Sequence, residues 1–400
     1  MGTEIVCGEL TGRPAGEDEV EIVERKGLGH PDTICDLVAD EVSQALCRTY
    51  RERAGRILHH NCDKALLVAG QANCRFGGGE VVAPMRLFLG DRASRVEGVD
   101  VGEVARYAAR AWFRRRLRYV DPDRHLEVQV ELRPGSPELT GLFRGAAVCG
   151  ANDSSAAVGY APGTETEILV REAERHLNAP AFHARYPQCG EDVKVLGVRR
   201  ARQLELTVAV PLVDRYIGGE GEYFELKEAV GDDLLRHLRA RARQVHEVRI
   251  HVNALDRRGT GAHGTYLTVL GTSAESADSG QVGRGNRANG VISCHRPSTM
   301  EAVAGKNPVS HVGKIYGVLS FRLAERLHAE VAGVEEAVVW LHSRIGEPID
   351  TPPLVSVKVR PGQGASVADL GGELRRVVIE ELAHVPVLCD ELALGRHPVC

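Results

Sequence analysis

The chain has little of several features that define other classes of protein. No apolar run in its 400 residues approaches the about 18 residues that a membrane-spanning helix needs, and aromatic residues make up only 4%. Its first ten residues lack the basic and apolar regions of a secretory signal, and Val6 stands where a myristoylation signal has Ser or Thr. We therefore expect no membrane span and no such signal, and a core built mainly of Val, Leu and Ala.

Paired cysteines and a strong net charge are also missing. The ten cysteines are scattered without Cys-x-x-Cys pairs, so we interpret them as reduced, mostly buried thiols of a cytoplasmic protein. The net charge of −5 argues against a general nucleic-acid binder, so any anion site must be local. Only seven of the 50 basic residues are Lys, and Lys26, Lys306 and Lys314 lie in or beside glycine-containing motifs. This retention of Lys indicates that an ammonium group is needed there.

Helix and strand patterns alternate along the whole chain, which is longer than one hydrophobic core usually supports. Helical spacing of apolar residues covers 32–50, 101–117, 166–177, 222–245, 312–327 and 373–382. Strand patterns cover 64–70, 81–89, 125–132, 204–210, 248–252, 266–270, 338–341 and 355–359. The mixture recurs about three times, which predicts an α+β protein of three similar subdomains at 1–120, 121–255 and 256–400. Alternating strands favour mostly antiparallel sheets with one face covered by helices.

The first motif with chemical potential is Gly27-Leu28-Gly29-His30-Pro31-Asp32, directly before a predicted helix. The glycines let the backbone approach a ligand closely, and a helix N-terminus offers free N–H groups to an anion. His30 can donate a hydrogen bond to a leaving oxygen, and Asp32 can hold a divalent metal. Equally, Pro31 and Asp32 can simply start the helix while His30 is a solvated loop residue.

A second motif runs from Gly271 to Gly290 and combines glycines with Asp278, Arg284 and Arg287. Such a segment can wrap a polyphosphate, although it fits neither the Walker pattern nor the dinucleotide-binding fingerprint. The competing interpretation is an exposed surface loop, but long loops in compact domains are more often functional. A third motif, 305–314, places Lys306, His311 and Lys314 around a helix start, where either a polyanion site or solvated charges would fit.

Three further segments carry weaker signals. The stretches 150–160, with Asp153, and 133–136, with Gly135 and Ser136, are each more often ordinary turns than sites. The run 59–63 invites a zinc interpretation, which we reject because no second ligand cluster lies at a suitable spacing. The absence of Gly-x-Ser-x-Gly and His-Glu-x-x-His gives little support to hydrolases of those kinds.

Seven strings taken together identify a family. They are Gly27-Leu28-Gly29-His30-Pro31-Asp32, Phe76-Gly77-Gly78-Gly79-Glu80, Ala151-Asn152-Asp153, Gly190-Glu191-Asp192-Val193-Lys194-Val195, Val213-Asp214-Arg215-Tyr216, Gly283-Arg284-Gly285-Asn286-Arg287, and Gly305-Lys306-Asn307-Pro308 through His311-Val312-Gly313-Lys314-Ile315-Tyr316. In this order, from about Val23 to Asp390, they resemble the archaeal-type S-adenosylmethionine synthetases (methionine adenosyltransferases). The resemblance implies three α+β subdomains around a pseudo-threefold axis and a homodimer with active sites built from both subunits. It also implies ATP, L-methionine, Mg²⁺ and often K⁺, with sulfur attack on C5′ followed by triphosphate hydrolysis.

The resemblance also assigns roles by position. His30 would contact the leaving oxygen, Asp32 and more weakly Asp63 would hold a cation, and Arg284, Lys306 and Lys314 would clamp phosphates. Asp153, Gly135 and Ser136 would lie near the nucleoside, and Asp278 would face the methionine ammonium. The further predicted contacts with nucleotide or substrate are Gly29, Gly283, Arg287 and His311.

Departures from the family pattern gather at the predicted nucleoside and methionine contacts. Ser279 follows Asp278, Pro134 precedes Gly135, and Ser298 and Thr299 precede Met300, whereas the phosphate and metal motifs are intact. This leaves open a pathway-specific transferase that accepts another nucleoside triphosphate or a methionine analogue. A non-catalytic nucleotide-binding regulator is disfavoured because the phosphate-facing Lys and Arg are present, and a nucleic-acid-binding protein is disfavoured by the acidic balance.

Overall fold

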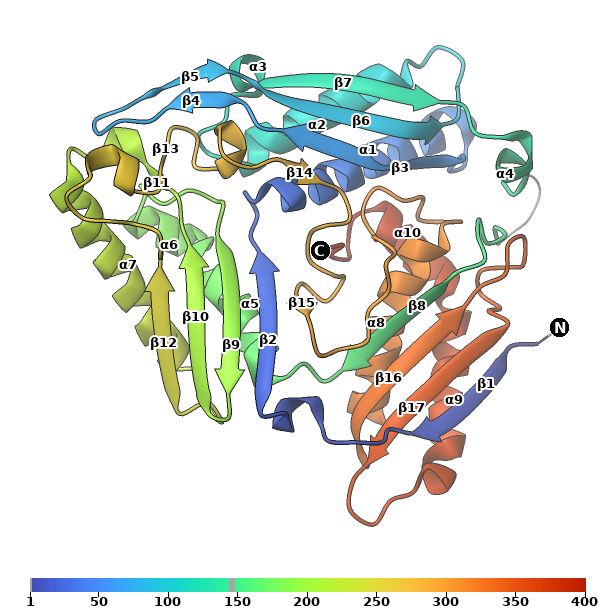
Figure 1. The fold of residues 1–400 in the computed structure, drawn as a ribbon. Helices are drawn as coiled ribbons and strands as arrows, with labels where there is room; N and C mark the ends of the chain where they lie inside the picture. Colours follow the sequence, from blue (N-terminus) through green and yellow to red (C-terminus); the bar gives the residue numbers. More distant parts are fainter. Residues whose placement is uncertain (1, 144–147) are drawn as a thin grey trace.

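The computed structural model describes residues 2–143 and 148–400. Within them, three larger β-sheets surround a central region, and helices cover each sheet on one face (Figure 1). The three largest hydrophobic clusters coincide with these three sheets and their helices, and Val, Leu and Ala dominate them. Each sheet with its helices is therefore a packed unit with its own core.

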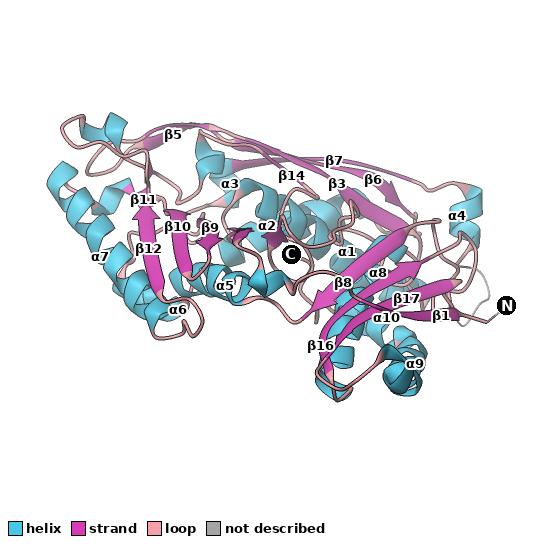
Figure 2. Ribbon diagram, turned by 60° about the horizontal axis from the view of Figure 1, so that its bottom comes forward, coloured by secondary structure: helices cyan, strands magenta, loops and turns pink. Residues whose placement is uncertain are grey.

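The first unit holds the sheet β14-β3-β6-β7 and, on one face, the helices α1 and α2 (Figure 2). Its elements are α1 (Pro31–Ala54), β3 (His60–Val68), β6 (Met85–Ala93), α2 (Val101–Arg116), α3 (Pro122–His125), β7 (Leu126–Arg133) and β14 (Gly280–Gln281). A two-stranded ribbon, β4 (Gln71–Asn73) and β5 (Glu80–Ala83), lies between β3 and β6 in the sequence, and α4 (Pro137–Gly141) follows β7.

The second unit holds the sheet β12-β10-β9-β2-β15, with α5 and α7 packed against it. Its elements are β2 (Val20–Lys26), α5 (Glu165–Leu177), α6 (Pro180–Arg185), β9 (Lys194–Arg200), β10 (Gln203–Ala209), α7 (Glu220–Arg239), β12 (Glu247–Val252) and β15 (Ile292–Ser293). Short strands β11 (Leu212–Val213) and β13 (Leu267–Thr268) pair beside it.

The third unit holds the sheet β1-β17-β16-β8 with α8, α9 and α10. Its elements are β1 (Glu4–Glu9), β8 (Ala156–Ala161), α8 (Val312–Glu330), β16 (Val334–His342), β17 (Leu354–Pro361), α9 (Val367–Ala383) and α10 (Val385–Ala393). No helix of the described residues is long and apolar enough to cross a bilayer.

The three sheets share one plan. Each is built on an antiparallel hairpin (β3/β6, β9/β10 or β16/β17), and a parallel edge strand (β7, β12 or β1) pairs with its second strand. The first strand of each hairpin pairs on its other side with a strand from elsewhere in the chain: β14, β2 or β8. This repetition agrees with the predicted α+β class and mostly antiparallel pairing.

The exchange of strands has a consequence for the boundaries predicted at 120/121 and 255/256. Strand β2, from the first range, pairs with β9 of the second, and β8, from the second range, pairs with β16 of the third. The units are thus discontinuous in sequence, so those boundaries do not separate the sheets. A periodicity argument cannot detect this, because it locates strands without identifying their partners.

Two local predictions need correction. The helix expected over 222–245 ends at Arg239, and the strand expected over 266–270 shrinks to Leu267–Thr268. The segment 271–290 is only partly exposed: Thr272, Gly280 and Asn286 are buried and β14 pairs with β3, whereas 276–279 and Arg284 are exposed. The segment is therefore anchored in the interior by its buried residues.

Candidate active site

A cavity of about 810 Å³ lies where β3, β6 and β14 meet the segment that leads into α8. Its wall is rich in charged side chains from separate parts of the chain. The charged and imidazole side chains that line it are Asp63, Lys64, Glu131, Asp153, Arg284, Glu301, Lys306 and His311. A polar cavity with both cations and carboxylates suits a charged ligand that arrives with metal ions.

Beside this cavity, the segment 27–32 forms the start of α1. Pro31 occupies the first helical position, and the Nδ1 atom of His30 accepts a hydrogen bond from the Asp32 amide at 3.2 Å, capping the helix. A Cβ at Gly29 would lie 2.6 Å from the Asp192 amide nitrogen, so only glycine allows the two segments to approach this closely. The helix start expected at this motif therefore occurs, and His30, a candidate for ligand chemistry, is itself the capping residue.

His30 is a neutral donor in this arrangement. Burial lowers its pKa to about 4, although the carboxylate of Asp32 acts in the opposite direction. Because Nδ1 accepts a hydrogen bond, the proton of the neutral ring lies on Nε2. His30 can therefore donate a hydrogen bond to an oxygen at neutral pH without carrying a charge.

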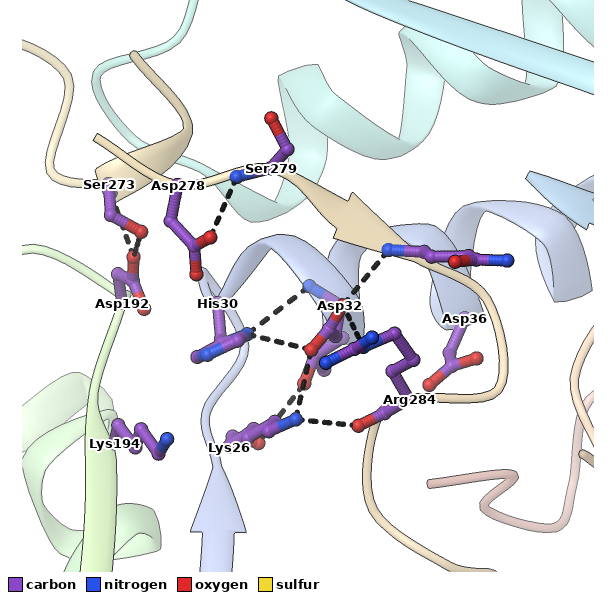
Figure 3. Close-up of polar contacts among 12 residues, drawn as sticks. Lys26, His30, Asp32, Asp36, Asp192, Lys194, Ser273, Asp278, Ser279 and Arg284 are labelled. Carbon is purple, nitrogen blue, oxygen red and sulfur yellow. Dashed lines mark hydrogen bonds and ion pairs between the residues drawn. The ribbon is translucent and has the colours of Figure 1, made fainter. Parts of the chain in front are cut away.

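Asp32 lies at the centre of a network that joins three segments (Figure 3). Its Oδ2 is 2.9 Å from Nζ of Lys26, and its Oδ1 accepts the Gln281 amide at 2.9 Å. The same ammonium of Lys26 donates to the carbonyl of Arg284 at 2.6 Å. The side chain of Arg284 remains 70% exposed, with Nε 4.0 Å from Asp32. The network therefore fixes the backbone beside Arg284 but leaves its guanidinium available.

Lys306 also lies on the cavity wall. Its Nζ is 2.7 Å from Asp63 and 3.3 Å from Glu301, and Lys64 approaches the other oxygen of Asp63 at 2.5 Å. Burial alone would raise the pKa of Asp63, but the two ammonium groups, Lys306 foremost, lower it to about 2. Asp63 is therefore a carboxylate throughout the physiological range.

His311 and Lys314 do not act as a pair on one surface. His311 lines the cavity and caps α8 through Nδ1, which accepts the Gly313 amide at 3.2 Å. Lys314 has a side chain that is 1% exposed, forms an ion pair with Asp40, and is not among the residues lining the cavity. In this arrangement the ammonium of Lys314 is paired with Asp40, so its phosphate contact, which the family resemblance implies, stays a prediction.

The predicted methionine and nucleoside residues have different positions. Asp153 lines the cavity, whereas Asp278 lies beside Asp192 near the start of α1 (Figure 3). Asp192 is buried, accepts both the amide and the hydroxyl of Ser273, and burial raises its pKa to about 7. Asp192 thus binds Ser273 of the second motif and lies beside Asp278 of the same motif.

Three further predicted contacts lie outside the cavity lining, as do Gly29, His30, Asp32, Asp278 and Lys314. Ser136 caps the short helix α4, and a Cβ at Gly135 would lie 2.4 Å from Nδ1 of His59. Arg287 lines a smaller neighbouring cavity of about 70 Å³, while Gly283, directly on the main cavity, has φ +85°. The structure therefore brings Asp63, Arg284, Lys306 and His311 to one cavity wall, with Asp32 beside Arg284 and His30 next to Asp32.

Comparison with known proteins supplies the family. A family model described as S-adenosylmethionine synthetase (AdoMet synthetase) matches residues 3–396. The S-adenosylmethionine synthase of Caldivirga maquilingensis is 42% identical, with 99% of each chain covered. That of Aeropyrum pernix is 45% identical, with 96% of each chain covered. The chain belongs to the S-adenosylmethionine synthetase family.

A solved structure supports the fold of this S-adenosylmethionine synthetase family member. An unusual S-adenosylmethionine synthetase from Campylobacter jejuni aligns with a TM-score of 0.62 over 94% of both chains, at 16% identity. At this identity the likeness extends to the architecture only. It agrees with the predicted arrangement of helices and mixed sheets.

S-adenosylmethionine synthetases use metal ions, and the donors here suit such an ion only with help from a ligand. No group of three or more His, Cys, Asp or Glu side chains in residues 2–143 and 148–400 is arranged to hold a metal. The single carboxylates Asp32 and Asp63 offer hard oxygen atoms, and Mg²⁺ commonly binds one or two carboxylates together with substrate phosphates. The residues therefore fit a metal that is completed by phosphate oxygens.

Sequence reasoning assigned no role to several residues of the synthetase site. Asp36 holds the backbone at 283–285, Glu301 pairs with Lys306, and Lys194 is close enough to influence the pKa of His30. Asp36 follows Asp32 by one helical turn, which is a signal that could have found it. Lys194 lies in the family string 190–195, which marked it without assigning it a role, whereas Glu301 lies outside any helical or glycine-containing pattern and is revealed only by the folded chain.

Proposed function

We propose that the chain synthesises S-adenosyl-L-methionine, phosphate and diphosphate from ATP, L-methionine and water. The observation that carries this proposal is the pairing of a neutral donor, His30, with cations of two segments, Arg284 and Lys306, around one polar network and cavity. Such a set matches a long polyanion with a leaving oxygen at one end. The family membership supports the same reaction.

The thioether sulfur of methionine is already a good nucleophile and needs no general base. The barrier lies in the leaving group and in the alignment of sulfur, C5′ and oxygen, so positioning and charge stabilisation supply the catalysis. As the C5′–O bond breaks and the S–C5′ bond forms, negative charge grows on the triphosphate. Nε2 of His30 would donate to that oxygen while Arg284 and Lys306 bind the phosphates, and water then cleaves the triphosphate to diphosphate and phosphate.

We assign the metal to Mg²⁺, with Asp32 and Asp63 as its protein ligands and K⁺ as a possible assisting cation. Bound Mg²⁺ would neutralise phosphate charge. Asp32 now accepts from Lys26 and Asp63 from Lys306, so both carboxylates are already held in place by an ammonium group. A ligand that draws Lys306 toward its phosphates would release one Asp63 oxygen for the ion.

Methionine and the nucleoside would occupy the two remaining acidic regions. Asp278, exposed beside Asp192, is suited to the methionine ammonium, and Asp153 on the cavity wall is suited to the ribose hydroxyls. Among the described residues, only a neighbouring backbone amide donates to each carboxylate: Ser279 to Asp278 and Ser154 to Asp153. They can therefore bind a ligand without breaking an ion pair.

We further propose a cytoplasmic homodimer in which the partner subunit covers the cavity. Apolar side chains at the rim support this, since Met300 is 94% and Leu66 43% exposed on the residues that line it. Covering these side chains would also remove water from the phosphate-binding groups. Analytical ultracentrifugation of the wild-type chain and of Met300→Glu tests the dimer, which we expect to weaken in the variant.

Product analysis tests the central proposal. Purified protein with Mg²⁺ and methionine is incubated with ATP, CTP or GTP, and sulfonium products are identified by mass spectrometry. We expect S-adenosylmethionine from ATP and little product from the other nucleotides. Greater turnover with CTP or GTP would favour the pathway-specific variant, and no sulfonium product from any nucleotide would refute the proposal. His30→Ala should lower turnover strongly while the fold is retained.

A further inference from the structure

One face of α1 carries a row of buried acids. Asp32, Asp36 and Asp40 follow one another at intervals of four residues, so they lie on the same side of the helix, and each is at most 5% exposed. Like charges at this spacing repel each other, and burial of a carboxylate is unfavourable unless donors satisfy it. Their presence beside a polyanion site therefore needs a specific explanation.

The donors to Asp36 come from the segment that carries Arg284. Its Oδ1 accepts the Gly283 amide at 2.7 Å, and the backbone of Gly285 also donates to this carboxylate. A Cβ at Gly285 would lie 2.0 Å from Oδ2, which shows how closely the peptide lies against the carboxylate. The N–H groups of the residues on both sides of Arg284 are thus held by one side chain.

Asp36 differs in its contacts from the carboxylates proposed to bind ligands. Asp32 pairs with Lys26, and Asp153 and Asp278 are exposed. Asp36 is buried and accepts hydrogen bonds from backbone N–H groups. Gly283 has φ +85°, in a region that is open to glycine, whose backbone has the widest conformational freedom. The hydrogen bond from its amide to Asp36, on the long helix α1, restricts that freedom.

We propose that Asp36 is a positioning residue of the synthetase reaction, which aims Arg284 at the triphosphate by holding the N–H groups of the residues on both sides of it. The inference rests on the proposed function and deepens it. Asp36 touches neither substrate nor metal in this account, because its acceptor oxygens are occupied by the backbone. Its effect on turnover must therefore act through the guanidinium of Arg284.

A double-mutant cycle tests this dependence. Asp36→Asn keeps the size of the side chain but presents an NH₂ group to one of the two backbone donors. In the wild-type background we expect it to lower kcat/KM for ATP by about 10- to 100-fold, as expected for a misplaced catalytic group. In the Arg284→Ala background we expect the same substitution to have less than a twofold further effect. Equal effects in both backgrounds would overturn the proposal.

Two additional variants separate positioning from folding. Asp233→Asn changes another buried carboxylate, which binds His176 and Arg185 far from the cavity, and should leave kcat/KM unchanged at temperatures where it is folded. If Asp36→Asn does not fold, Gly285→Ala disturbs the same contact from the loop. We expect it to show the same loss and the same dependence on Arg284, and an additive loss would again overturn the proposal.

Turnover and the equilibrium binding of Mg²⁺–ATP are both measured for every protein of the double-mutant cycle. If the wild-type protein binds ATP but forms no sulfonium product, the proposed reaction fails while the binding cycle still tests Asp36. If the wild-type protein turns over and both cycles are additive, only the role of Asp36 is refuted. A nonadditive cycle in binding, with unchanged thermal midpoints, supports positioning.

Discussion

The two cation-bearing segments of the site, 278–287 and 305–314, differ in how they hold their charges. Arg284 is 70% exposed and has its closest carboxylate oxygen at 4.0 Å. Lys306 has a side chain that is 5% exposed and is paired with Asp63 and Glu301. Lys314, in the same segment, is buried against Asp40. The segment 278–287 thus presents an exposed guanidinium, whereas Lys306 and Lys314 of the segment 305–314 are held in buried ion pairs.

This difference indicates two tasks within one site. An exposed guanidinium can capture an anion at once, because no partner has to leave. A buried ammonium exchanges one oxyanion for another, which costs little only when the released carboxylate finds a new cation. Binding at Lys306 should therefore depend on the metal that takes over Asp63, whereas binding at Arg284 should not.

The largest effect is expected from breaking the buried ion pair between Lys314 and Asp40. Lys314→Met leaves Asp40 with the amide of Gly305 and the side chain of Gln44 but no cation. We expect the free energy of unfolding to fall by about 3–5 kcal/mol in urea denaturation, as for other buried pairs that lose one partner. Lys314→Met with Asp40→Leu should recover most of this loss. An unchanged midpoint in the single variant would show that Lys314 is not a structural partner.

The next effect concerns turnover. Arg284→Ala and Lys306→Ala should each lower kcat/KM for ATP by about 10²–10³-fold, since each removes a cation from the developing charge. The loss caused by Arg284→Ala should lessen as ionic strength rises, because exposed charges are screened. The loss caused by Lys306→Ala should be nearly independent of salt. Steady-state kinetics at two salt concentrations provide the check, with exposed Arg258→Ala as control. If the losses caused by Arg284→Ala and Lys306→Ala depended equally on salt, the two segments would not differ in how they hold their charges.

The same comparison explains what could be predicted from the sequence. Glycine spacing and retained lysines singled out Gly283-Arg284 and Gly305-Lys306 as candidate ligand contacts, and the structure places all four residues close to one cavity. Helical periodicity predicted α1 and α8, but neither it nor the family resemblance indicated that Lys314 pairs with Asp40 of another helix. Pairings across units, such as β8 with β16 or Asp36 with Gly283, depend on the packing of distant segments and left no local pattern.

A smaller effect should appear at acid pH and mainly in the second segment. Burial lowers the pKa of His60 to about 3, and its Nδ1 lies 3.1 Å from the side-chain nitrogen of Asn307. Since unfolded His binds a proton near pH 6.5 and the folded ring does not, the stability from His60 is lost as pH falls from about 6.5 toward 3. Hydrogen exchange compared at pH 5 and pH 7.5 should show that protection is lost more in 305–314 than in 278–287 at the lower pH. His60→Gln should reduce this difference between the two segments. Equal loosening would contradict this localisation.

The smallest expected effect is the response of the ligand-free fold to magnesium. Because no three metal-ligating side chains gather in the described residues, Mg²⁺ alone should leave the thermal midpoint unchanged, although its removal by EDTA should abolish turnover. Mg²⁺ with ATP should raise the midpoint by the linkage of binding to folding. That rise should be reduced more by Asp63→Asn than by Asp278→Asn, because only Asp63 exchanges its lysine for the ion. A rise with Mg²⁺ alone would mean that the site is preformed, and the charges of Lys306 would then be free before the nucleotide arrives.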